Sequence, residues 1–375
     1  MEKIKTKSSL GLYVHIPFCL RKCFFCSFVV YIGKNNHKKK YLTCLEQELK
    51  EYSQKRIKTI YFGGGTPTFL NGDELTRLIK SVKANFLIEE NCEFTIEANP
   101  DTIDFPKARL LKELGVNRVS IGAQTFSNRY LKFLGRTHQA KDVEKCFAAL
   151  RKAGFDNITL DLMYGFPGQT LGELKDDIKK IIKFNSEHLS LYTLTVEPRS
   201  KFNIQNLKMP STQRLGAFYT HITRALEKKG FAQYEISNFA KPGKQSEHNC
   251  IYWKCQDYIG LGAGAHSHFE GTRFWNTSSV PTYLRLAEKG KPTVDGKEKL
   301  NKDRRLLEAL LFGLRMNEGV SLCILEKQFN AKFSKQTKEK ISQFCKDEFL
   351  ILKNSHLKTT LQGRLVLDEL SVRLI

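Results

Sequence analysis

Three cysteines near the start of the chain constrain it more than any other feature. Cys19, Cys23 and Cys26 follow the spacing CxxxCxxC, so one short loop can place three thiolates around three corners of a cubane 4Fe–4S cluster. Phe28 occupies the position where a fourth local cysteine would complete the set. One iron is therefore left without a nearby protein ligand, and an open metal position is where a small molecule can bind and react.

A structural zinc site is the alternative for these cysteines. Such a site takes four ligands, and no fourth Cys or His stands at the usual spacing. His15 is near in sequence, but it belongs to an apolar, strand-like run that precedes the loop. The sequence therefore favours the cluster over zinc.

The composition is that of a cytoplasmic globular protein. The chain has 375 residues, which is enough for a sizeable core and two domains. No run of about 18 apolar residues occurs, and no apolar segment follows the basic N-terminus, so we expect neither a membrane span nor a signal peptide. The cysteines outside the loop are scattered, which predicts free thiols in a reducing compartment rather than a disulfide framework.

The net charge of +22 raises the question of an acidic partner. The lysines are spread along the whole chain, and only residues 38–40 form a tight run, which we expect on the exposed start of a helix. The sequence contains no recognisable nucleic-acid-binding module. We therefore expect a solvated basic surface and no nucleic-acid partner.

Apolar strand-like segments alternate with amphipathic helical segments through the first half of the chain. This order predicts parallel strands joined by right-handed crossovers. Six strands are too few for a closed eight-fold barrel, so we predict an α/β fold with an open, partial (β/α)6 barrel. The predicted strands lie at 12–16, 59–62, 93–97, 118–122, 158–162 and 189–194, and the helices at 40–52, 72–85, 104–114, 139–153 and 170–184.

The pattern changes after residue 211. One helix is predicted near 215–226, and the stretch 231–300 is rich in glycine and aromatic residues and is predicted to be irregular. Helices, a short hairpin and a final helix over 303–375 predict a small winged-helix-like α+β domain. We therefore predict domains at 1–235 (the barrel), 236–302 (an irregular connecting region) and 303–375.

Candidate ligand-binding residues lie at or near the carboxyl ends of the predicted strands, where ligand sites gather in parallel α/β folds. The glycines of 63–68 would let the backbone approach a ligand closely. Asp161 lies within an apolar strand, so we expect it to face a polar ligand or a cation such as Arg136. Glu97 and Gln124 are the other two candidates of this kind. The alternatives are a simple turn for the glycines, a solvated strand-end acid for Glu97 and a structural ion pair for Asp161.

The CxxxCxxC loop resembles that of the radical S-adenosylmethionine (SAM) superfamily. The resemblance implies that the amine and carboxylate of SAM bind the open iron. It further implies that the reduced cluster cleaves SAM to a 5′-deoxyadenosyl radical, with Phe25 packing on the adenine. An electron donor to the cluster is implied as well.

A closer resemblance covers nearly the whole chain. The motifs GGGTPT, EANP, GAQTF, LGRTH and DLMYGFPGQT follow the loop in the order and spacing of the oxygen-independent coproporphyrinogen III oxidase family, which includes the heme chaperone branch, HemW. This resemblance implies cluster ligation by Cys19, Cys23 and Cys26. It also implies SAM contacts at Tyr13, Phe25, Gly64, Gly65, Thr66, Glu97, Gln124, Arg136, Asp161 and Thr195.

Two features favour the chaperone branch. The oxidase has a further cysteine where this chain has Phe28, and the segment 247–253 is similar to the HNxxYW signature of the chaperones. A histidine can give an axial nitrogen to heme iron, and aromatic rings offer flat apolar faces to a porphyrin. The heme candidates are His248, Asn249, Tyr252 and Trp253. For His248 the alternative is a purely structural role. Alternative heme ligands are the thiols of Cys250 and Cys255 and the pair His266 and His268.

The sequence thus predicts a heme chaperone that binds a 4Fe–4S cluster, SAM and heme, and hands heme to acceptor proteins such as respiratory enzymes. Contact with a membrane would be transient. The first alternative is an enzyme that decarboxylates coproporphyrinogen III oxidatively to protoporphyrinogen IX, and a more remote one is a radical SAM enzyme that modifies RNA. The sequence assigns no catalytic residue, and it leaves the oligomeric state and the acceptor open.

Overall fold

The computed structural model describes residues 10–32 and 35–374, which form two compact units. The first unit contains the described residues up to Met209 together with Asp257–Glu298, and the second contains Pro210–Gln256 together with the described residues from Lys299 onward. The predicted domain boundaries at 235 and 302 remain predictions. The basic N-terminal residues, on which the expectation of no signal peptide partly rests, lie outside the described residues.

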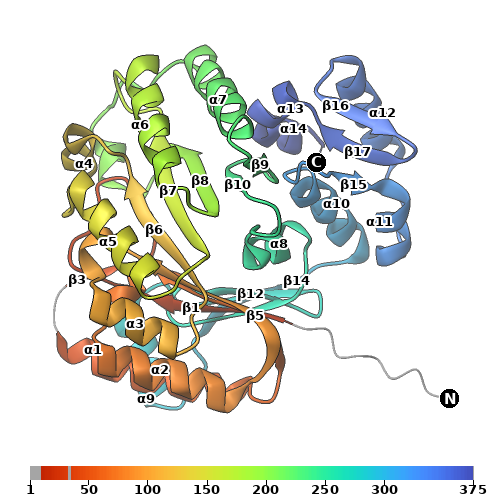
Figure 1. Cartoon of the computed structure of the whole chain (residues 1–375). Helices are drawn as coiled ribbons and strands as arrows, with labels where there is room; N and C mark the ends of the chain where they lie inside the picture. The colour runs from red at the N-terminus through yellow and green to blue at the C-terminus, as the bar shows by residue number, and fades with distance from the viewer. Residues whose placement is uncertain (1–9, 33–34, 375) are drawn as a thin grey trace. The chain divides into compact units, whose positions relative to one another are not determined.

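The first unit is built on a sheet whose six predicted strands are all parallel. Across the sheet the order is β14-β13-β12-β11-β1-β4-β5-β6-β7-β8, so the predicted open, partial barrel is confirmed (Figure 1). The six strands are β1 (Leu10–Ile16), β4 (Arg56–Gly64), β5 (Leu87–Ala98), β6 (Arg118–Gln124), β7 (Ile158–Tyr164) and β8 (His188–Thr193).

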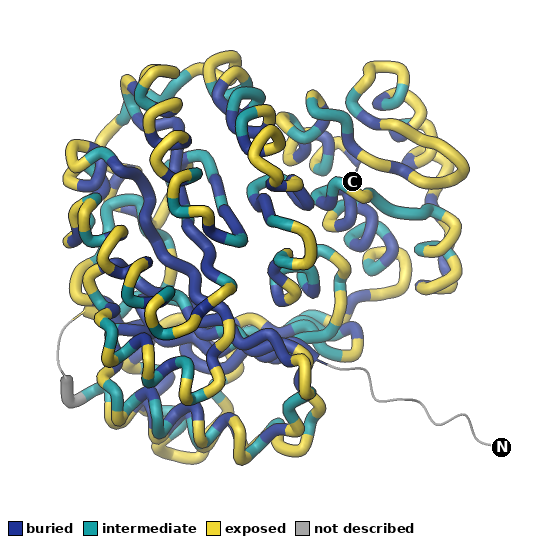
Figure 2. Tube along the Cα trace, in the orientation of Figure 1, coloured by how far each residue is buried: buried dark blue, intermediate teal, exposed yellow. Residues whose placement is uncertain are grey.

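Side chains alternate between two unlike faces of this sheet. One face is apolar and buried, with Leu12 opposite Ile60 and Val14 opposite Phe62 in the ladder. The helices between the strands cover this face, and their outer sides are exposed (Figures 1 and 2). They are α1 (Asn35–Glu51), α2 (Gly72–Asn85), α3 (Phe105–Glu113), α4 (Asn128–Leu134), α5 (Ala140–Lys152) and α6 (Leu171–Lys183).

The other face, which we call the polar face, carries tyrosines, hydroxyls and carboxylates. Tyr13 lies opposite Tyr61 in the ladder, Glu97 opposite Ser120, and Asp161 opposite Ser190. The alternation of strand residues therefore gathers the predicted polar site residues on the side of the sheet away from the helix layer.

Beyond β1 the sheet continues through β11, which pairs parallel with β1, into strands that pair antiparallel with one another. We call these strands the antiparallel extension. It consists of β11 (Tyr258–Leu261), β12 (His266–Phe269), β13 (Thr272–Asn276) and β14 (Val294–Lys299), with α9 (Val280–Glu288) between the last two strands. The prediction of an irregular stretch over 231–300 is therefore wrong. These strands are short and interrupted by glycines such as Gly260 and Gly262, so they lack the alternating apolar pattern that sequence reasoning needs.

Short elements complete the first unit around the cysteine loop. They are β2 (Phe18–Cys19), which pairs with β3 (Tyr31–Ile32), and the 3-10 turns η1 (Pro67–Phe69), η2 (Pro100–Thr102) and η3 (Lys201–Ile204).

The second unit is mainly helical and has its own apolar core, which includes Leu310, Ile341, Phe344 and Leu357. A three-stranded sheet in the order β15-β17-β16 forms the wing of the predicted winged-helix-like domain. The elements are α7 (Thr212–Glu227), β9 (Ala232–Gln233), β10 (Asn238–Ala240), α8 (Glu247–Trp253), α10 (Lys302–Gly313), β15 (Val320–Ser321), α11 (Leu322–Phe329), α12 (Lys335–Lys346), β16 (Leu350–Lys353), β17 (His356–Thr359), α13 (Leu361–Leu365) and α14 (Leu367–Leu374).

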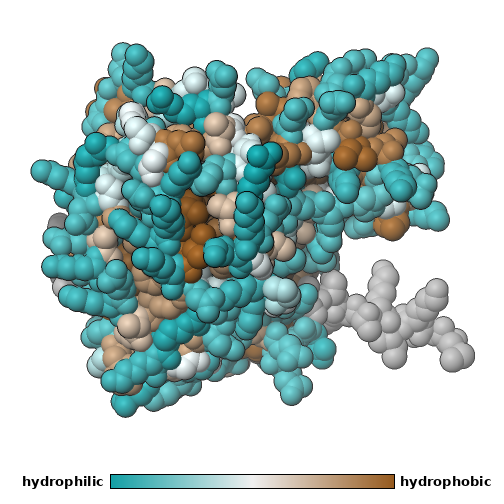
Figure 3. Space-filling view, turned by 45° about the horizontal axis from the view of Figure 1, so that its top comes forward, coloured by the Kyte–Doolittle hydropathy of each residue, from teal (hydrophilic) through white to brown (hydrophobic). Residues whose placement is uncertain are grey.

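The view in Figure 3 shows a mostly hydrophilic surface on which apolar side chains gather in separate patches. Among the residues that the structure describes, every helix is too short or too polar to traverse a lipid bilayer.

Candidate functional site

The cysteine loop leaves the sheet directly after β1 and is held by polar contacts to each thiol. Cys19 ends β2, and its Sγ lies 3.4 Å from Thr66 Oγ1. The guanidinium of Arg136 donates from Nη1 to Cys23 Sγ at 3.5 Å. The backbone N–H of residue 28 donates to the thiol of Cys26. Hydrogen bonds to sulfur of this kind are typical of thiolates that bind iron–sulfur clusters, where they tune the reduction potential.

The raised pKa values of two of these thiols show that a bound group must supply positive charge. Burial raises the pKa of Cys19 to about 11, although the bond to Thr66 opposes this shift. Burial also raises the pKa of Cys26. The buried thiols therefore need a neighbouring cation to ionise, and iron supplies that charge on binding while protons are released.

The three cysteines are not arranged as ligands of a single ion. Within residues 10–32 and 35–374, no three His, Cys, Asp or Glu side chains converge closely enough to hold one metal ion. A cubane does not require such convergence, because each of its thiolate ligands binds a different iron atom. Donor type and spacing therefore fit a three-cysteine cluster.

A chain of hydrogen bonds links two of the cysteines through neighbouring strand ends. Asn99 donates from Nδ2 to Thr66 Oγ1 at 3.2 Å and accepts at Oδ1 from Arg136 Nη2 at 2.7 Å. Since Thr66 contacts Cys19 and Arg136 contacts Cys23, Asn99 bridges the two supports of the loop. Asn99 was missed as a site residue, although it lies in the EANP motif.

Glu97 and the glycine turn after β4 form the next part of the site. The Glu97 carboxylate accepts from Tyr61 Oη at 2.8 Å and from the backbone N–H of Gly64 at 3.2 Å. Burial raises the pKa of Glu97. The backbone N–H groups of Gly65 and Thr66 donate to the carbonyls of residues 16 and 18, at 2.9 Å each. The predicted turn is thus anchored to the start of the cysteine loop.

The ring of His15 packs against this turn. His15 was also missed as a site residue. Its Nε2 donates to the carbonyl of Val29 at 2.8 Å, so its Nδ1 accepts from the hydroxyl of Tyr13 at 3.0 Å. Burial lowers the pKa of His15 to about 4, which keeps the ring neutral, and the hydrogen bond to the Val29 carbonyl fixes this tautomer. The ring also fills the space beside Gly64, where an added Cβ would lie 2.4 Å from it.

Gln124 and Asp161 lie further along the polar face. Gln124 ends β6 with a left-handed φ of 65°, and its Oε1 accepts from the hydroxyl of Tyr192 at 2.7 Å. Asp161 accepts from Ser120 Oγ at 3.1 Å. Arg136, which was named as a possible cation partner of Asp161, donates instead to the carbonyl of Gly122 and to Asn99.

Two of the predicted SAM-contact residues lie away from this polar group. Phe25 packs against an apolar cluster that includes Phe202 and Tyr130. Thr195 is exposed, and its hydroxyl donates to the carbonyl of Thr193 at 3.5 Å. The structure therefore places Glu97, Gln124 and Asp161 on three neighbouring strands, whereas Phe25 and Thr195 lie away from them.

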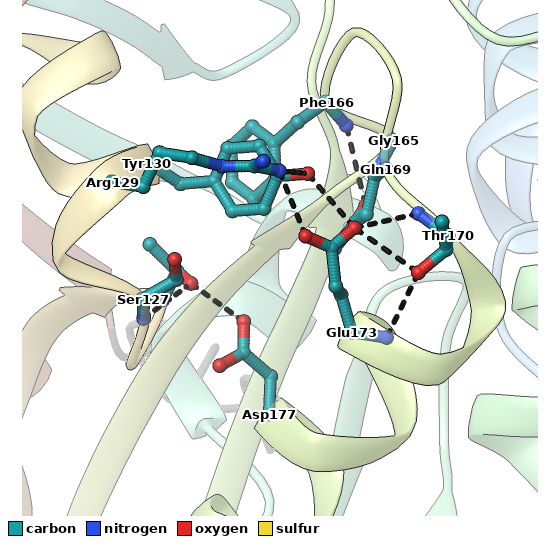
Figure 4. A network of polar contacts seen from close by, with 10 residues as sticks. Ser127, Arg129, Tyr130, Gly165, Phe166, Gln169, Thr170, Glu173 and Asp177 are labelled. Atoms are coloured by element: carbon teal, nitrogen blue, oxygen red, sulfur yellow. Dashed lines mark hydrogen bonds and ion pairs between the residues drawn. The ribbon is translucent and has the colours of Figure 1, made fainter.

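A polar network fixes the helix that supports the loop (Figure 4). Glu173 of α6 accepts from Arg129 Nη2 at 2.8 Å and from the hydroxyl of Tyr130 at 3.1 Å, and it also caps its own helix at Thr170. Thr170 and Glu173 form a capping box at the start of this helix. Arg129 and Tyr130 belong to α4, so the network holds this helix in place. At the end of α4 the Leu134 carbonyl accepts from the N–H of residue 24, which connects the helix to the cysteine loop.

The predicted heme residues lie on α8 of the second unit. His248 is fully buried, and its Nε2 lies 2.7 Å from the hydroxyl of Tyr252, one helical turn further on. Asn249 is partly exposed, and Trp253 packs beneath the guanidinium of Arg315 at 4.6 Å. Heme ligation by His248 remains a prediction, and it requires the imidazole to leave this buried position.

The alternative heme ligands differ in their surroundings. Cys250 packs with Trp253 against an apolar cluster, and Cys255 packs against the core of the second unit. His266 and His268 lie on β12 in the first unit, where His266 is exposed and His268 Nδ1 is 3.5 Å from a carboxylate oxygen of Asp257.

The sequence is similar to known protein families and to two heme chaperones. Residues 13–181 match the family model of the radical SAM superfamily, and residues 300–366 match that of the HemN C-terminal domain. The heme chaperone HemW of Bacillus subtilis (strain 168) is 39% identical over 371 residues, which span 95% of this chain and 97% of that protein. The heme chaperone HemW of Lactococcus lactis subsp. lactis (strain IL1403) is 36% identical over 94% of this chain and 93% of that protein.

A solved structure has the same fold over almost the whole length. The coproporphyrinogen III oxidase (HemN) from Escherichia coli, described as a radical SAM enzyme, superposes with a TM-score of 0.86 over 98% of this chain and 90% of that chain. Its sequence identity is 23%, so this likeness concerns the fold alone.

Proposed function

Because this chain belongs to the HemW family of the radical SAM superfamily, we propose that it is a heme chaperone with a 4Fe–4S cluster and SAM as cofactors and heme as cargo. The observation that carries this proposal is the similarity to two heme chaperones along nearly the full length of both chains. The cysteine loop, with its three supported thiols, provides the matching cofactor site.

The residues of the first unit would divide the work of holding the cofactors. Cys19, Cys23 and Cys26 would ligate the cluster, and Arg136 would orient Cys23 through its hydrogen bond to the sulfur. When bound, the reduced cluster supplies one-electron chemistry to SAM. The carboxylates and amides of the polar face would bind the polar groups of SAM, with Glu97 held in place by Tyr61 and Gly64.

The cargo step involves partners outside the chain. We propose that heme is handed to acceptor proteins such as respiratory enzymes, that a separate electron donor reduces the cluster, and that the protein works in the cytoplasm. The net charge of +22 supports association with partners that carry acidic groups, the heme propionates among them.

We do not propose the oxidase reaction for this chain. The structural likeness to the oxidase shows a shared fold, and a fold can carry different functions. Phe28 stands where the oxidase motif has a further cysteine, and the Bacillus subtilis and Lactococcus lactis relatives, which match along nearly the whole chain, are named heme chaperones.

The experiment uses anaerobically reconstituted protein in two assays. In the first, protein loaded with hemin is mixed with a heme-free respiratory enzyme, and we expect heme transfer that equimolar bovine serum albumin loaded with hemin does not match. In the second, coproporphyrinogen III, SAM and dithionite are supplied, and we expect no protoporphyrinogen IX. Catalytic formation of protoporphyrinogen, or the absence of hemin binding by the wild type, would overturn the proposed function.

A further inference from the structure

The antiparallel extension of the first unit continues the polar face beyond the SAM residues. Tyr13 of β1 lies opposite Gly260 of β11, and His266 of β12 lies opposite Trp275 of β13. Since Tyr258 pairs with His268 in antiparallel register, Gly260 comes opposite His266. Tyr13, Gly260, His266 and Trp275 therefore share one row across four adjacent strands. With strands about 4.8 Å apart, the backbone of His266 lies about 10 Å from that of Tyr13.

The side chains of this row point away from the helix layer. The alternate residue of β13, Phe274, stacks on Tyr52 at the end of α1, with ring centroids 6.4 Å apart. His266 and Trp275 project from the opposite side of the strands, because successive residues alternate between faces. Arg273 belongs to the same side, since it is two residues before Trp275.

His266 has the properties of an accessible metal ligand. Its imidazole is exposed and stacks on the indole of Trp275 with ring centroids 5.8 Å apart and planes at 25°. In the part of the chain that the structure describes, neither ring nitrogen of His266 has a hydrogen-bond partner. Burial and the neighbouring charge of Arg273 lower the pKa of His266, so the ring is neutral at neutral pH, and neutral imidazole is the form that binds metals.

Two neighbours define the surroundings of this imidazole. The Trp275 indole lies against the backbone of Gly296, where an added Cβ would come within 2.3 Å of the ring. This close approach fixes the indole, and the indole fixes the plane of the imidazole. Arg273 brings a guanidinium to the same face, and its Nη1 lies 4.0 Å from a carboxylate oxygen of Glu298. A guanidinium recognises carboxylates by paired hydrogen bonds.

We propose that His266, Trp275 and Arg273 form an iron-porphyrin site on the polar face, with the His266 imidazole as axial ligand to the iron. Trp275 orients the imidazole and provides apolar contact, and Arg273 binds a propionate carboxylate. The inference rests on the proposed function, because it assigns a place to the cargo. It also puts the cargo in the same unit as the cysteine loop and within about two strand spacings of Tyr13.

This site contrasts with the one predicted from the sequence. His248 is fully buried and already lies at hydrogen-bond distance from Tyr252, whereas His266 is exposed. Coordination by His266 requires only that an iron porphyrin approaches from solvent, and no internal hydrogen bond must break.

The test is a hemin titration of the reconstituted holoprotein, followed in the Soret region and by electron paramagnetic resonance (EPR). For His266→Ala we expect at least a tenfold increase in the Kd for hemin and loss of the axial-histidine spectrum, with added imidazole restoring the spectrum. His356→Ala, which changes an exposed histidine of the second unit, should bind hemin as the wild type does. Far-UV circular dichroism and the SAM response of the cluster would show that each variant is folded.

A second variant separates the role of the carboxylates. Arg273→Gln should raise the Kd for hemin several-fold but leave the Kd for hemin dimethyl ester unchanged, because the ester carries no propionate charge. Wild-type hemin affinity and spectrum in His266→Ala, or loss of the axial signature in His248→Ala instead, would overturn the inference and leave the proposed function standing. Failure of the wild type to bind hemin would remove both.

Discussion

At the scale of single residues, Gly64 shows why the turn after β4 requires glycine. Its φ is 111°, a region that residues with a Cβ rarely adopt, and its N–H donates to Glu97. An added Cβ would lie 2.4 Å from the ring of His15, which is itself held by Tyr13 and Val29. The substitution therefore strains the backbone and displaces the imidazole that supports the cysteine loop.

We predict that Gly64→Ala weakens SAM binding at least tenfold and destabilises the fold by about 1–3 kcal/mol through backbone strain. Equilibrium dialysis with SAM and urea unfolding would measure the two effects. Gly172→Ala is the matched control, because Gly172 lies in the first turn of α6 and an added Cβ there meets only an ordinary contact at 3.8 Å. Equal SAM affinity in Gly64→Ala and Gly172→Ala would refute this role of the turn.

Asp161 leads to a prediction about pH. Burial, followed by the nearby charge of Glu97, raises the pKa of Asp161 to about 7 in the folded protein, whereas an unfolded Asp titrates near 3.9. Between these values the folded state holds the proton more tightly than the unfolded state. The contribution of Asp161 to stability is therefore full below about pH 4, falls as the pH rises, and levels off above about pH 7.

We predict that Asp161→Asn removes this dependence. The difference in the free energy of unfolding between Asp161→Asn and the wild type should grow in favour of the variant from pH 4 to pH 7, by at most about 1.4 kcal/mol per pH unit. Urea unfolding of the SAM-free protein at several pH values would measure it. A difference that is constant over this range would show that Asp161 titrates as an ordinary surface acid.

At the scale of elements, α1 is joined to the antiparallel extension by one buried acid. The Glu48 carboxylate accepts from the N–H of Gly262 at 2.9 Å, from Asn276 Nδ2 at 2.5 Å and from the hydroxyl of Tyr283 at 2.6 Å. These donors come from the turn after β11, from β13 and from α9. Glu48 therefore fixes the strands that carry His266 and Trp275 onto the helix behind them.

We predict that Glu48→Ala lowers the free energy of unfolding by roughly 2–4 kcal/mol, because three buried donors lose their acceptor. Glu51→Ala, at the exposed end of the same helix, should stay within about 0.5 kcal/mol of the wild type. Chemical denaturation of the two variants under identical conditions makes the comparison. Similar losses in both variants would mean that Glu48 does not hold these elements together.

The same elements show what the sequence could and could not predict. The parallel strands and the helix Gly72–Asn85 follow clear periodicity and were predicted, although β5 begins at Leu87, six residues before its predicted start. The strands β11–β14 were missed because they are short and interrupted by glycines, so they lack a clear alternation of apolar and polar residues. Asn99 and His15 were missed as site residues because their importance comes from contacts between strand ends, which only the fold brings together.

At the scale of the whole molecule, the first unit combines an apolar face under helices with a polar face that carries the cofactor residues. The three cysteines follow β1, and the predicted SAM-contact residues Glu97, Gln124 and Asp161 come from three successive parallel strands. The proposed heme site lies on the same face, at its antiparallel edge. Cluster, SAM and cargo would then share one continuous surface of one unit.

The most direct test of this account is EPR spectroscopy of the anaerobically reconstituted, dithionite-reduced protein with and without SAM. We predict about four iron and four sulfide per chain, a reduced 4Fe–4S signal whose g-values change when SAM is added, and no such signal in Cys23→Ala. Zinc in place of iron, or a cluster signal that SAM leaves unchanged, would contradict the account.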